Sequence, residues 1–392
     1  MRAVTRPLDR QLDLNDVARG DGYLFVRDGV GFAGRGVAAR VRADEAVALL
    51  ASIDHDDTVG NTPGPIALGA LPFRPDADAE LVVPVVVVGK DADGRGWVTT
   101  IDDADEPLLN DSAPTPMAAA WTIEPEVTVD HYLAAVAAAR DAVRDGRMNK
   151  AVIARPIRVT ADAPIDVHAV LHRLKATFGS SHRFSIDGFI GASPELLVAV
   201  DDGMVSSFPL AGTTRTTGDD ALDAELAAEL HASSKNRIEH AAAIEMVRDT
   251  LLPFCSYLDW APEPEVIKVA NVQHLGSRAE GMLSQPHADV IELVRALQPT
   301  PAVGGYPRSA AIELIERVEG FERGVYGGTV GWCDGHGNGR WAVSLRCAEL
   351  SDDRRSARLV AGGGIVADSD PLSELAETQA KFQAMLSALV RP

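Results

Sequence analysis

The segment at residues 184–212 constrains the fold more than any other part of the chain. It reads FSIDGFIGASPELLVAVDDGMVSSFPLAG, in which apolar runs are interrupted by the turn signal DDG and by prolines. This pattern predicts two or three antiparallel strands joined by tight turns. The pattern returns as a predicted hairpin at 22–36 and as a second one at 327–350. We therefore expect an α+β fold with extensive antiparallel sheet, in one large unit.

Other segments supply the remaining predicted elements. Further strands are expected at 81–89, 96–103, 150–159, 265–275 and 358–366. Residues 81–89, LVVPVVVVG, are the longest apolar run, which is too short to span a membrane and suits a buried strand. Helical periodicity is expected at 130–146, near 166–178, over roughly 220–252, at 287–297, at 309–319 and from 371 to the end.

Charge and cysteine content exclude several classes of function. The 392-residue chain has a net charge of −20, which argues against nucleic acid or an anionic membrane as the main partner. Its three cysteines, at 255, 333 and 347, are odd in number and lack metal-ligand spacing. The first residues, MRAVTRPLDRQLDL, carry no secretory pattern. We expect a protein of the reducing cytoplasm.

The predicted helix at 233–252 places a carboxylate among apolar residues. On a helical wheel Glu239 shares a face with His240, Ala243, Val247 and Leu251. A buried carboxylate is costly unless it is paired or binds a metal ion. From this segment alone, a buried Glu–Arg pair is the simpler interpretation.

The closing helix carries two more carboxylates. Asp370 can cap it and Pro371 suits its first position. Glu374 and Glu377 then share one stripe, with Lys381 four residues beyond Glu377, as on a solvated helix edge. Together with Glu239, they instead give three hard oxygen ligands on two helices. Such a set suits Mg²⁺ bound beside an anionic substrate.

The glycine run at 361–366, AGGGIV, precedes this helix. Its backbone N–H groups can approach an anion closely, yet it matches neither a Walker nor a Rossmann fingerprint. As an isolated feature, it predicts a bulged strand.

Four further residues could carry chemistry, although each also has a simpler structural interpretation. Lys150 opens an apolar strand, where burial could turn it into a general base, or it is an ordinary surface lysine. Glu195, among apolar residues, could stay protonated as a general acid or be an edge-strand charge. Strand alternation places Arg346 on a floor of small residues, as for a carboxylate-binding pocket, or facing outward. His274 could hold a substrate hydroxyl or be a structural histidine.

Taken in order, these segments resemble the chorismate-utilising enzymes, among them isochorismate, salicylate and anthranilate synthases. The resemblance covers 126–392 and includes KAVIAR, FIGASPELL, PLAGTTR, SKNRIEH, VQHL, PTPAVGGYP and AGGGIVADSDPLSELAETQAK. It implies large antiparallel sheets packed as a sandwich with outer helices. Residues 126–392 would be the chorismate-binding catalytic region, and 1–125 the N-terminal part of the same fold.

The resemblance also implies roles for individual residues. Glu239 and Glu377 match direct ligands of Mg²⁺, and Glu374 matches a residue that acts through a metal-bound water. Asn236 stands where relatives carry an acid. Lys150 and Glu195 match the catalytic base and acid. The positions that match substrate contacts are Gly212, Thr213, His274, Ala302, Tyr326, Arg346, Gly362, Gly364 and Lys381.

A few positions distinguish the reactions within this family. Lys150 resembles the water-using enzymes, Ala211 departs from the lysine of aminodeoxychorismate synthases, and Ala302 resembles isochorismate synthases. The resemblance therefore implies an isomerase that makes isochorismate, for menaquinone or siderophore biosynthesis, without a glutaminase subunit and as a monomer. Tyr326 and Gln298 depart from this pattern and leave a salicylate synthase as the alternative. From a different class, a regulatory protein would bind chorismate without turnover.

Overall fold

A computed structural model describes residues 1–102, 104, 118–269 and 272–390. Its larger sheet has 13 strands. In spatial order they are β10 (Trp121–Pro125), β11 (Lys150–Ala161), β25 (Ser356–Ile365), β24 (Cys347–Leu350), β13 (Phe189–Ser193), β12 (His182–Ile186), β2 (Tyr23–Arg27), β3 (Val30–Arg35), β8 (Val86–Lys90), β9 (Gly96–Ile101), β1 (Arg2–Pro7) and β5 (Asp54–Asp57), with β21 (Gly305–Tyr306) pairing beside β11. The pairs are antiparallel apart from β1 and β5.

Two further sheets complete the architecture. The second has nine strands, in the order β17 (Cys255–Trp260), β20 (Ala279–Leu283), β15 (Met204–Phe208), β14 (Leu196–Asp201), β23 (Gly339–Val343), β22 (Thr329–Asp334), β6 (Ile66–Leu71), β7 (Glu80–Val83) and β4 (Ala39–Arg42). The third is smaller, with β16 (Leu210–Arg215), β19 (Val272–Gly276) and β18 (Glu265–Val269).

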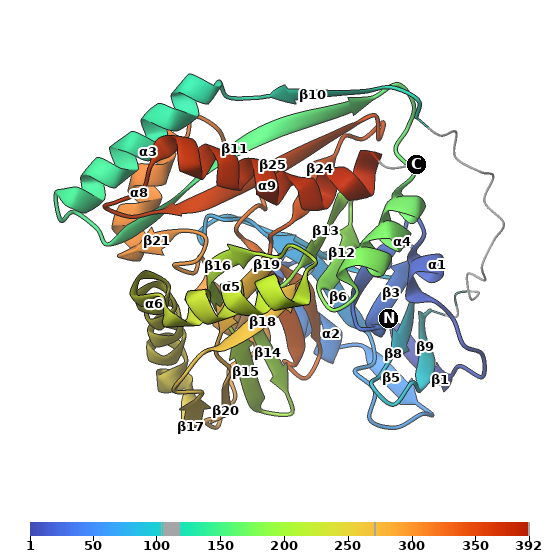
Figure 1. Ribbon diagram of the computed structural model, residues 1–392. Helices are drawn as coiled ribbons and strands as arrows, with labels where there is room; N and C mark the ends of the chain where they lie inside the picture. The colour runs from blue at the N-terminus through green and yellow to red at the C-terminus, as the bar shows by residue number, and fades with distance from the viewer. Residues whose placement is uncertain (103, 105–117, 270–271, 391–392) are drawn as a thin grey trace.

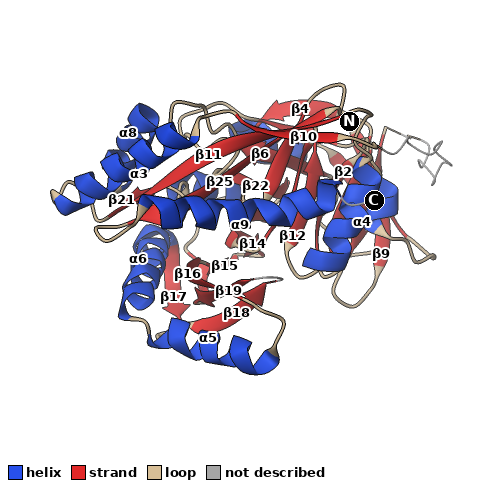
Figure 2. Ribbon diagram, turned by 45° about the horizontal axis from the view of Figure 1, so that its top comes forward, coloured by secondary structure: helices blue, strands red, loops and turns tan. Residues whose placement is uncertain are grey.

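The helices lie outside these sheets (Figures 1 and 2). They are α1 (Leu14–Ala18), α2 (Ala46–Ala51), α3 (Val129–Arg144), α4 (Val167–Phe178), α5 (Asp220–Ala232), α6 (Ser234–Leu251), α7 (Val290–Leu297), α8 (Arg308–Val318) and α9 (Pro371–Val390). In Figure 1, α9 (red) lies along β25 and β11, and in Figure 2, α5 and α6 flank the small sheet. No helix within the described residues is both long and apolar enough to span a membrane.

The core confirms the expected sandwich. One buried cluster joins Phe25 and Phe184 of the larger sheet to Leu68 and Val330 of the nine-stranded sheet. Separate clusters lie between the sheets and their helices: one joins the larger sheet to α1, α4 and α9, and another joins the nine-stranded sheet to α2, α6 and α7. Strands from residues 1–125 belong to both large sheets, so this part is continuous with the rest; a division at 125 stays a prediction.

Several predicted elements are divided in the structure. The segment at 184–212 contributes to five strands, β12 to β16, rather than two or three. The apolar run 81–89 is split at Pro84, with β7 in one large sheet and β8 in the other, because proline cannot donate a ladder hydrogen bond. The predicted strand 265–275 is the hairpin β18–β19; residues 270 and 271 lie outside the described part, as does residue 103 of the predicted strand 96–103.

The predicted helix at 220–252 is two helices. α5 ends at Ala232, and Ser233, in extended conformation, caps α6 by accepting a hydrogen bond from the Asn236 N–H. A serine that caps in this way begins a new helix in a new direction. The closing helix agrees with expectation, since Asp370 accepts a hydrogen bond from the Ser373 N–H and Pro371 is its first residue.

Candidate active site

Glu195 and Arg346 lie where the chain passes between the two large sheets. Glu195 connects β13 to β14, and Arg346 connects β23 to β24. The two connections are joined by backbone hydrogen bonds, in which the Val343 N–H donates to Glu195 O and the Ala192 N–H donates to Arg346 O, each 3.1 Å long. The prediction that Arg346 alternates within one strand is wrong. The strand ends at Val343, and Arg346 has a φ of 50°, a left-handed conformation that costs about 1 kcal/mol in a non-glycine residue.

Glu195 is a buried carboxyl group. It is 3% exposed, and burial raises its pKa to about 8, although a backbone hydrogen bond from Leu210 and the charge of Lys150 act in the opposite direction. The side chain therefore keeps its proton at neutral pH, as a general acid must. This is the environment that the apolar neighbours of Glu195 in the sequence indicate.

Lys150 lies at the first position of β11, beside a carboxylate from α6. Its Nζ donates a hydrogen bond to Glu239 Oε1, so Glu239 is paired with a lysine and not with an arginine. The backbone of β25 makes room for this pair. A Cβ atom added at Gly364 would lie 2.6 Å from Lys150 Cε and 3.3 Å from Glu239 Oε1. Only glycine at this position leaves both side chains where they are.

The face of α6 agrees with the helical wheel. His240, Ala243, Val247 and Leu251 are buried, whereas Ile238 on the opposite side is 72% exposed. Glu239 itself is at the edge of this buried face and is partly exposed. It can therefore be reached by a ligand, which a fully enclosed carboxylate could not.

Two carboxylates of α9 face the neighbouring glycine. Glu374 is buried and accepts a hydrogen bond of 2.8 Å from Ser369 Oγ at its Oε1. A Cβ at Gly363 would lie 2.6 Å from Glu374 Oε2 and 3.8 Å from Glu377 Oε1. Gly362–Gly364 pair with β11 without a register shift, so the predicted bulge is wrong; the bare backbone of β25 instead accommodates acidic side chains.

Lys381 connects Glu377 to the glycine run. Its Nζ is 2.5 Å from Glu377 Oε1 and donates a hydrogen bond of 2.8 Å to Gly362 O. Burial raises the pKa of Glu377, but the charges of Lys381, Arg346 and Lys150 together hold the pKa below its usual value. Glu377 is therefore ionised at neutral pH, and its side chain, which is nearly half exposed, can be reached from solvent.

The donor set of this site fits Mg²⁺. Three carboxylates, Glu239, Glu374 and Glu377, surround the backbone of two consecutive glycines, and hard oxygen donors are what Mg²⁺ takes. In this structure Lys150 pairs with Glu239, and Lys381 pairs with Glu377. Among the described residues, the three do not lie as close together as a closed metal cage would need. An arrangement this open suits an ion that shares its coordination with substrate and water.

Cationic and hydroxyl groups border the carboxylates. Tyr326, Arg346 and Lys381 line a cavity of about 10 Å³, enough for one water. Burial raises the pKa of Tyr326 to about 12, so its hydroxyl is a hydrogen-bond donor at any physiological pH. A carboxylate is larger than this cavity, so these side chains would have to move apart to bind one, which would then meet a guanidinium, an ammonium and a phenol.

The small sheet supplies polar groups from the other side. Gly212 has a φ of 75°, and Thr213 Oγ1 is hydrogen-bonded to His274 Nδ1 at 3.0 Å. Burial, Arg346 and Lys381 lower the pKa of His274 to about 3, which keeps the imidazole neutral. His274 Nε2 is buried and has no hydrogen-bond partner within the described part of the protein. Buried polar atoms normally have a partner, so this nitrogen is available to bind a ligand.

The Ala302 loop and a buried ion pair hold the start of β11. The loop contacts β11 in two ways: the Val152 N–H donates a hydrogen bond to Gly304 O, and β21 pairs with β11. Arg323 Nη2 donates to Val152 O, and Glu319 Oε1 accepts from the Ala154 N–H.

The sequence interpretation missed Glu319, Arg323 and Ser369. The i,i+4 spacing of Glu319 and Arg323 in the sequence could have predicted their ion pair.

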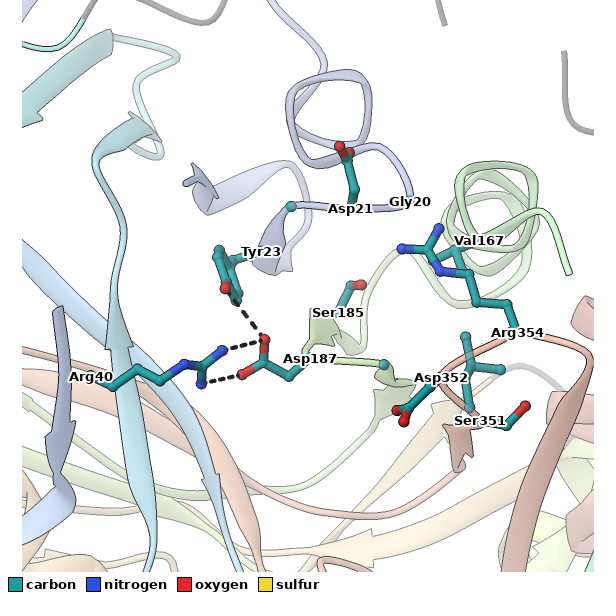
Figure 3. A pocket seen from close by; sticks show the side chains of 13 residues that line it. Gly20, Asp21, Tyr23, Arg40, Val167, Ser185, Asp187, Ser351, Asp352 and Arg354 are labelled. Carbon is teal, nitrogen blue, oxygen red and sulfur yellow. Dashed lines mark hydrogen bonds and ion pairs between the residues drawn. The ribbon is translucent and has the colours of Figure 1, made fainter. Parts of the chain in front are cut away.

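A larger cavity lies elsewhere. It measures about 470 Å³ and lies at the β12–β13 turn, the end of β13 opposite Glu195 (Figure 3). There Asp187 accepts hydrogen bonds from Arg40 and from the Tyr23 hydroxyl. None of the predicted site residues lines this cavity.

The fold and this arrangement of side chains place the chain in a known class. A family model described as chorismate binding enzyme matches residues 64–390, and the protein belongs to that family. The chain is 42% identical over 340 residues to a Mycobacterium tuberculosis protein named MenF, covering 83% of this chain and 86% of that protein. It is 38% identical over 336 residues to the isochorismate synthase DhbC of Bacillus subtilis, covering 83% and 81% of the two chains.

A solved structure confirms the fold. MenF, the menaquinone-specific isochorismate synthase of Escherichia coli, superimposes with a TM-score of 0.85 at 24% sequence identity. The superposition covers 99% of this chain and 94% of that one.

Proposed function

We propose that this protein is an isochorismate synthase, an isomerase that converts chorismate to isochorismate. The observation that carries the proposal is the burial of Glu195, which is 3% exposed. Burial raises the pKa of this group to about 8, so that a carboxylic acid is available at neutral pH. The relatives named above as isochorismate synthases support the reaction.

In the proposed reaction Lys150 and Glu195 move protons in opposite senses. Lys150 Nζ, after releasing to solvent the proton that it donates to Glu239 in the structure, takes a proton from the water whose oxygen forms a bond to C2. The ring double bonds shift, the C4–O bond breaks, and Glu195 protonates the departing hydroxyl as water. Exchange with solvent restores both groups, so nothing is gained or lost overall.

The remaining site residues bind and orient the substrate. Arg346 and Tyr326 would hold the enolpyruvyl carboxylate, with Lys381 nearby. Gly362 and Gly364 would lie beside the ring carboxylate, where Gly364 lets Lys150 and Glu239 come close, and Ala302 would shape the substrate pocket. Gly212, Thr213 and the neutral His274 would lie below the ring, where the unpartnered Nε2 can bond a hydroxyl.

We further propose Mg²⁺ as the cofactor. Glu239 and Glu377 would bind it directly and Glu374 through a water. Bound there, the ion would neutralise the charge of the ring carboxylate among three acidic side chains. We propose that the protein works without a glutaminase subunit, because water is the only nucleophile that the reaction needs. We also propose that it is a monomer, since no coiled-coil pattern or repeat in the sequence indicates assembly.

Product analysis tests the reaction. The purified protein with chorismate and Mg²⁺ should give isochorismate as the product separated by chromatography. Salicylate with an equal amount of pyruvate would overturn the proposal in favour of a salicylate synthase, for which Tyr326 is the distinguishing residue. Saturable chorismate binding without any product would instead show a regulatory protein.

Two variants test the acid and base roles. Lys150→Ala and Glu195→Gln should each reduce kcat by at least about 100-fold, the usual contribution of general acid–base catalysis. Lys90→Ala at the end of β8 and Glu124→Gln on the exposed strand β10 are matched controls that should keep activity. Near-normal turnover of either site variant, with the fold verified by circular dichroism, would refute its role.

A further inference from the structure

Two histidines and an aspartate converge on the side of the molecule formed by α1 and α4. His168 and His172, one turn apart on α4, each place Nε2 2.9 Å from Asp16 Oδ1 of α1. The two Nε2 atoms are 3.1 Å apart, and the rings are inclined by 73° to each other. None of these residues belongs to the proposed active site.

The three atoms form a nearly equilateral triangle. A tetrahedral zinc ion with bonds of about 2.0–2.1 Å needs its ligand atoms about 3.3 Å apart. The observed edges of 2.9–3.1 Å are within a few tenths of an ångström of this spacing. Histidines at i and i+4 lie on one helix face, as in known zinc sites on helices.

Burial and ligand chemistry agree with a bound ion. The side chains of His168, His172 and Asp16 are 39%, 40% and 42% exposed, so an ion can enter and a water can occupy its fourth position. Without an ion, Asp16 Oδ1 only accepts, so each Nε2 either donates to it or exchanges a hydrogen bond with the other Nε2; an ion would replace the protons in these contacts. Among the described residues, this is the one group of three such ligand atoms that lie within 4.8 Å of one another.

We propose that Asp16, His168 and His172 form a site for a divalent transition-metal ion of the Zn²⁺ type, separate from the Mg²⁺ site proposed above. Imidazole ligands select zinc-like ions, whereas the carboxylates near Gly363 suit Mg²⁺. The ion joins α1, in the N-terminal part of the chain, to α4, in the chorismate-binding region. It therefore stabilises the contact between the two parts and does not take part in the reaction.

Metal binding by the full chain tests this directly. The protein is stripped with a chelator, exchanged into buffer with millimolar Mg²⁺ to occupy carboxylate sites, and titrated with Zn²⁺ by calorimetry. One Zn²⁺ per chain is expected. Co²⁺ in its place should give the intense visible absorption of a tetrahedral ion, which an octahedral oxygen site does not give. Absence of Zn²⁺ binding by the wild-type chain, or a Co²⁺ spectrum of the octahedral kind, would overturn the proposal.

Variants locate the ion. His172→Ala and Asp16→Asn should each weaken Zn²⁺ binding by at least about tenfold and remove the rise in Tm that Zn²⁺ causes, while turnover of chorismate is unchanged. His287→Ala, at an exposed histidine beside Gln285, is the matched control and should bind Zn²⁺ normally. Full-strength binding by folded His172→Ala would place the ion elsewhere and refute the site. The wild-type titration decides the question even where a variant folds poorly.

Discussion

Glu195 makes the stability of the protein depend on pH in an unusual direction. Its pKa rises from the ordinary 4.5 to about 8 on folding because the group is buried. Between these two values the folded chain keeps a proton that the unfolded chain releases, so stability falls as the pH rises from about 4.5 to about 8. In Glu195→Gln, the free energy of unfolding should decrease less between pH 5 and pH 8.5 than in the wild type, as measured by urea unfolding at the two pH values.

Exposed Glu124→Gln is the control for that measurement and should follow the wild type. The same proton predicts that turnover decreases above about pH 8, because the general acid is then ionised. Parallel pH dependence of stability in the wild type and Glu195→Gln would contradict the burial argument.

At single positions, the sequence predicted burial better than conformation. The apolar neighbours of Glu195 indicated that it is buried, and the structure confirms this; the catalytic roles of Lys150 and Glu195 stay predictions. Arg346 was assigned to the right sheet region, but its left-handed φ and its place between sheets depend on contacts with Ala192, far away in the chain. Glu319 and Arg323 were missed because their partners, Val152 and Ala154, are remote in sequence.

At the level of elements, the glycine run of β25 determines how closely the side chains of α6, α9 and β11 approach. Gly364→Ala places a methyl group 2.6 Å from Lys150 Cε, so Lys150 or β25 must shift. We expect kcat to fall at least about tenfold, with a loss of about 1–3 kcal/mol in the free energy of unfolding from overpacking. Steady-state kinetics and urea unfolding measure the two effects.

The control is Gly96→Ala in β9, where the nearest atom would be 3.6 Å away, an ordinary contact. Wild-type kcat in Gly364→Ala would show that Lys150 does not need its present position.

Helix and strand types were predictable, whereas several boundaries were not. The periodicity of α6 predicted Glu239 in the middle of the buried face, whereas its side chain lies at the edge of that face and is partly exposed. The break at Ser233 was predicted as helix interior. Ser233 follows an alanine and precedes a serine, so local propensity alone does not stop the helix there. The hydrogen bond from the Asn236 N–H to Ser233 Oγ forms only once the chain has turned.

At the scale of the whole molecule, Arg323 contacts three segments that are far apart in the sequence, at Phe73, Val152 and Val303. Its guanidinium lies 4.3 Å from the ring centre of Phe73, donates to Val303 O and pairs with Glu319, with side chains only 3% and 1% exposed. Glu319→Gln leaves a buried charge without its counter-ion. We expect a loss of about 3–5 kcal/mol in the free energy of unfolding, measured with urea.

Glu316→Gln on α8 is the matched control. Glu316 pairs with Arg74 at 3.1 Å, but both side chains are about half exposed, and the expected change is within about 0.5 kcal/mol. A similar small effect in Glu319→Gln would mean that water reaches Arg323.

The fold class followed from hairpins that are local in sequence, but the division of strands between two sheets did not. β7 and β8 are adjacent in the chain and belong to different sheets, while β2 pairs with β12, more than 150 residues away. Such pairings depend on the total burial of both sheet faces, which no local pattern encodes.

The two connections that carry Glu195 and Arg346 have a consequence for how this family can diversify. Each connection is short and is fixed at both ends, in one sheet before it and in the other after it. If one residue were added or removed there, the short connection could not absorb it without shifting the register of a paired strand, which would reverse the inside and outside faces of that strand. Evolution of new reactions at this site must therefore proceed by exchange of side chains at constant loop length, unlike enzymes whose active sites lie on variable loops.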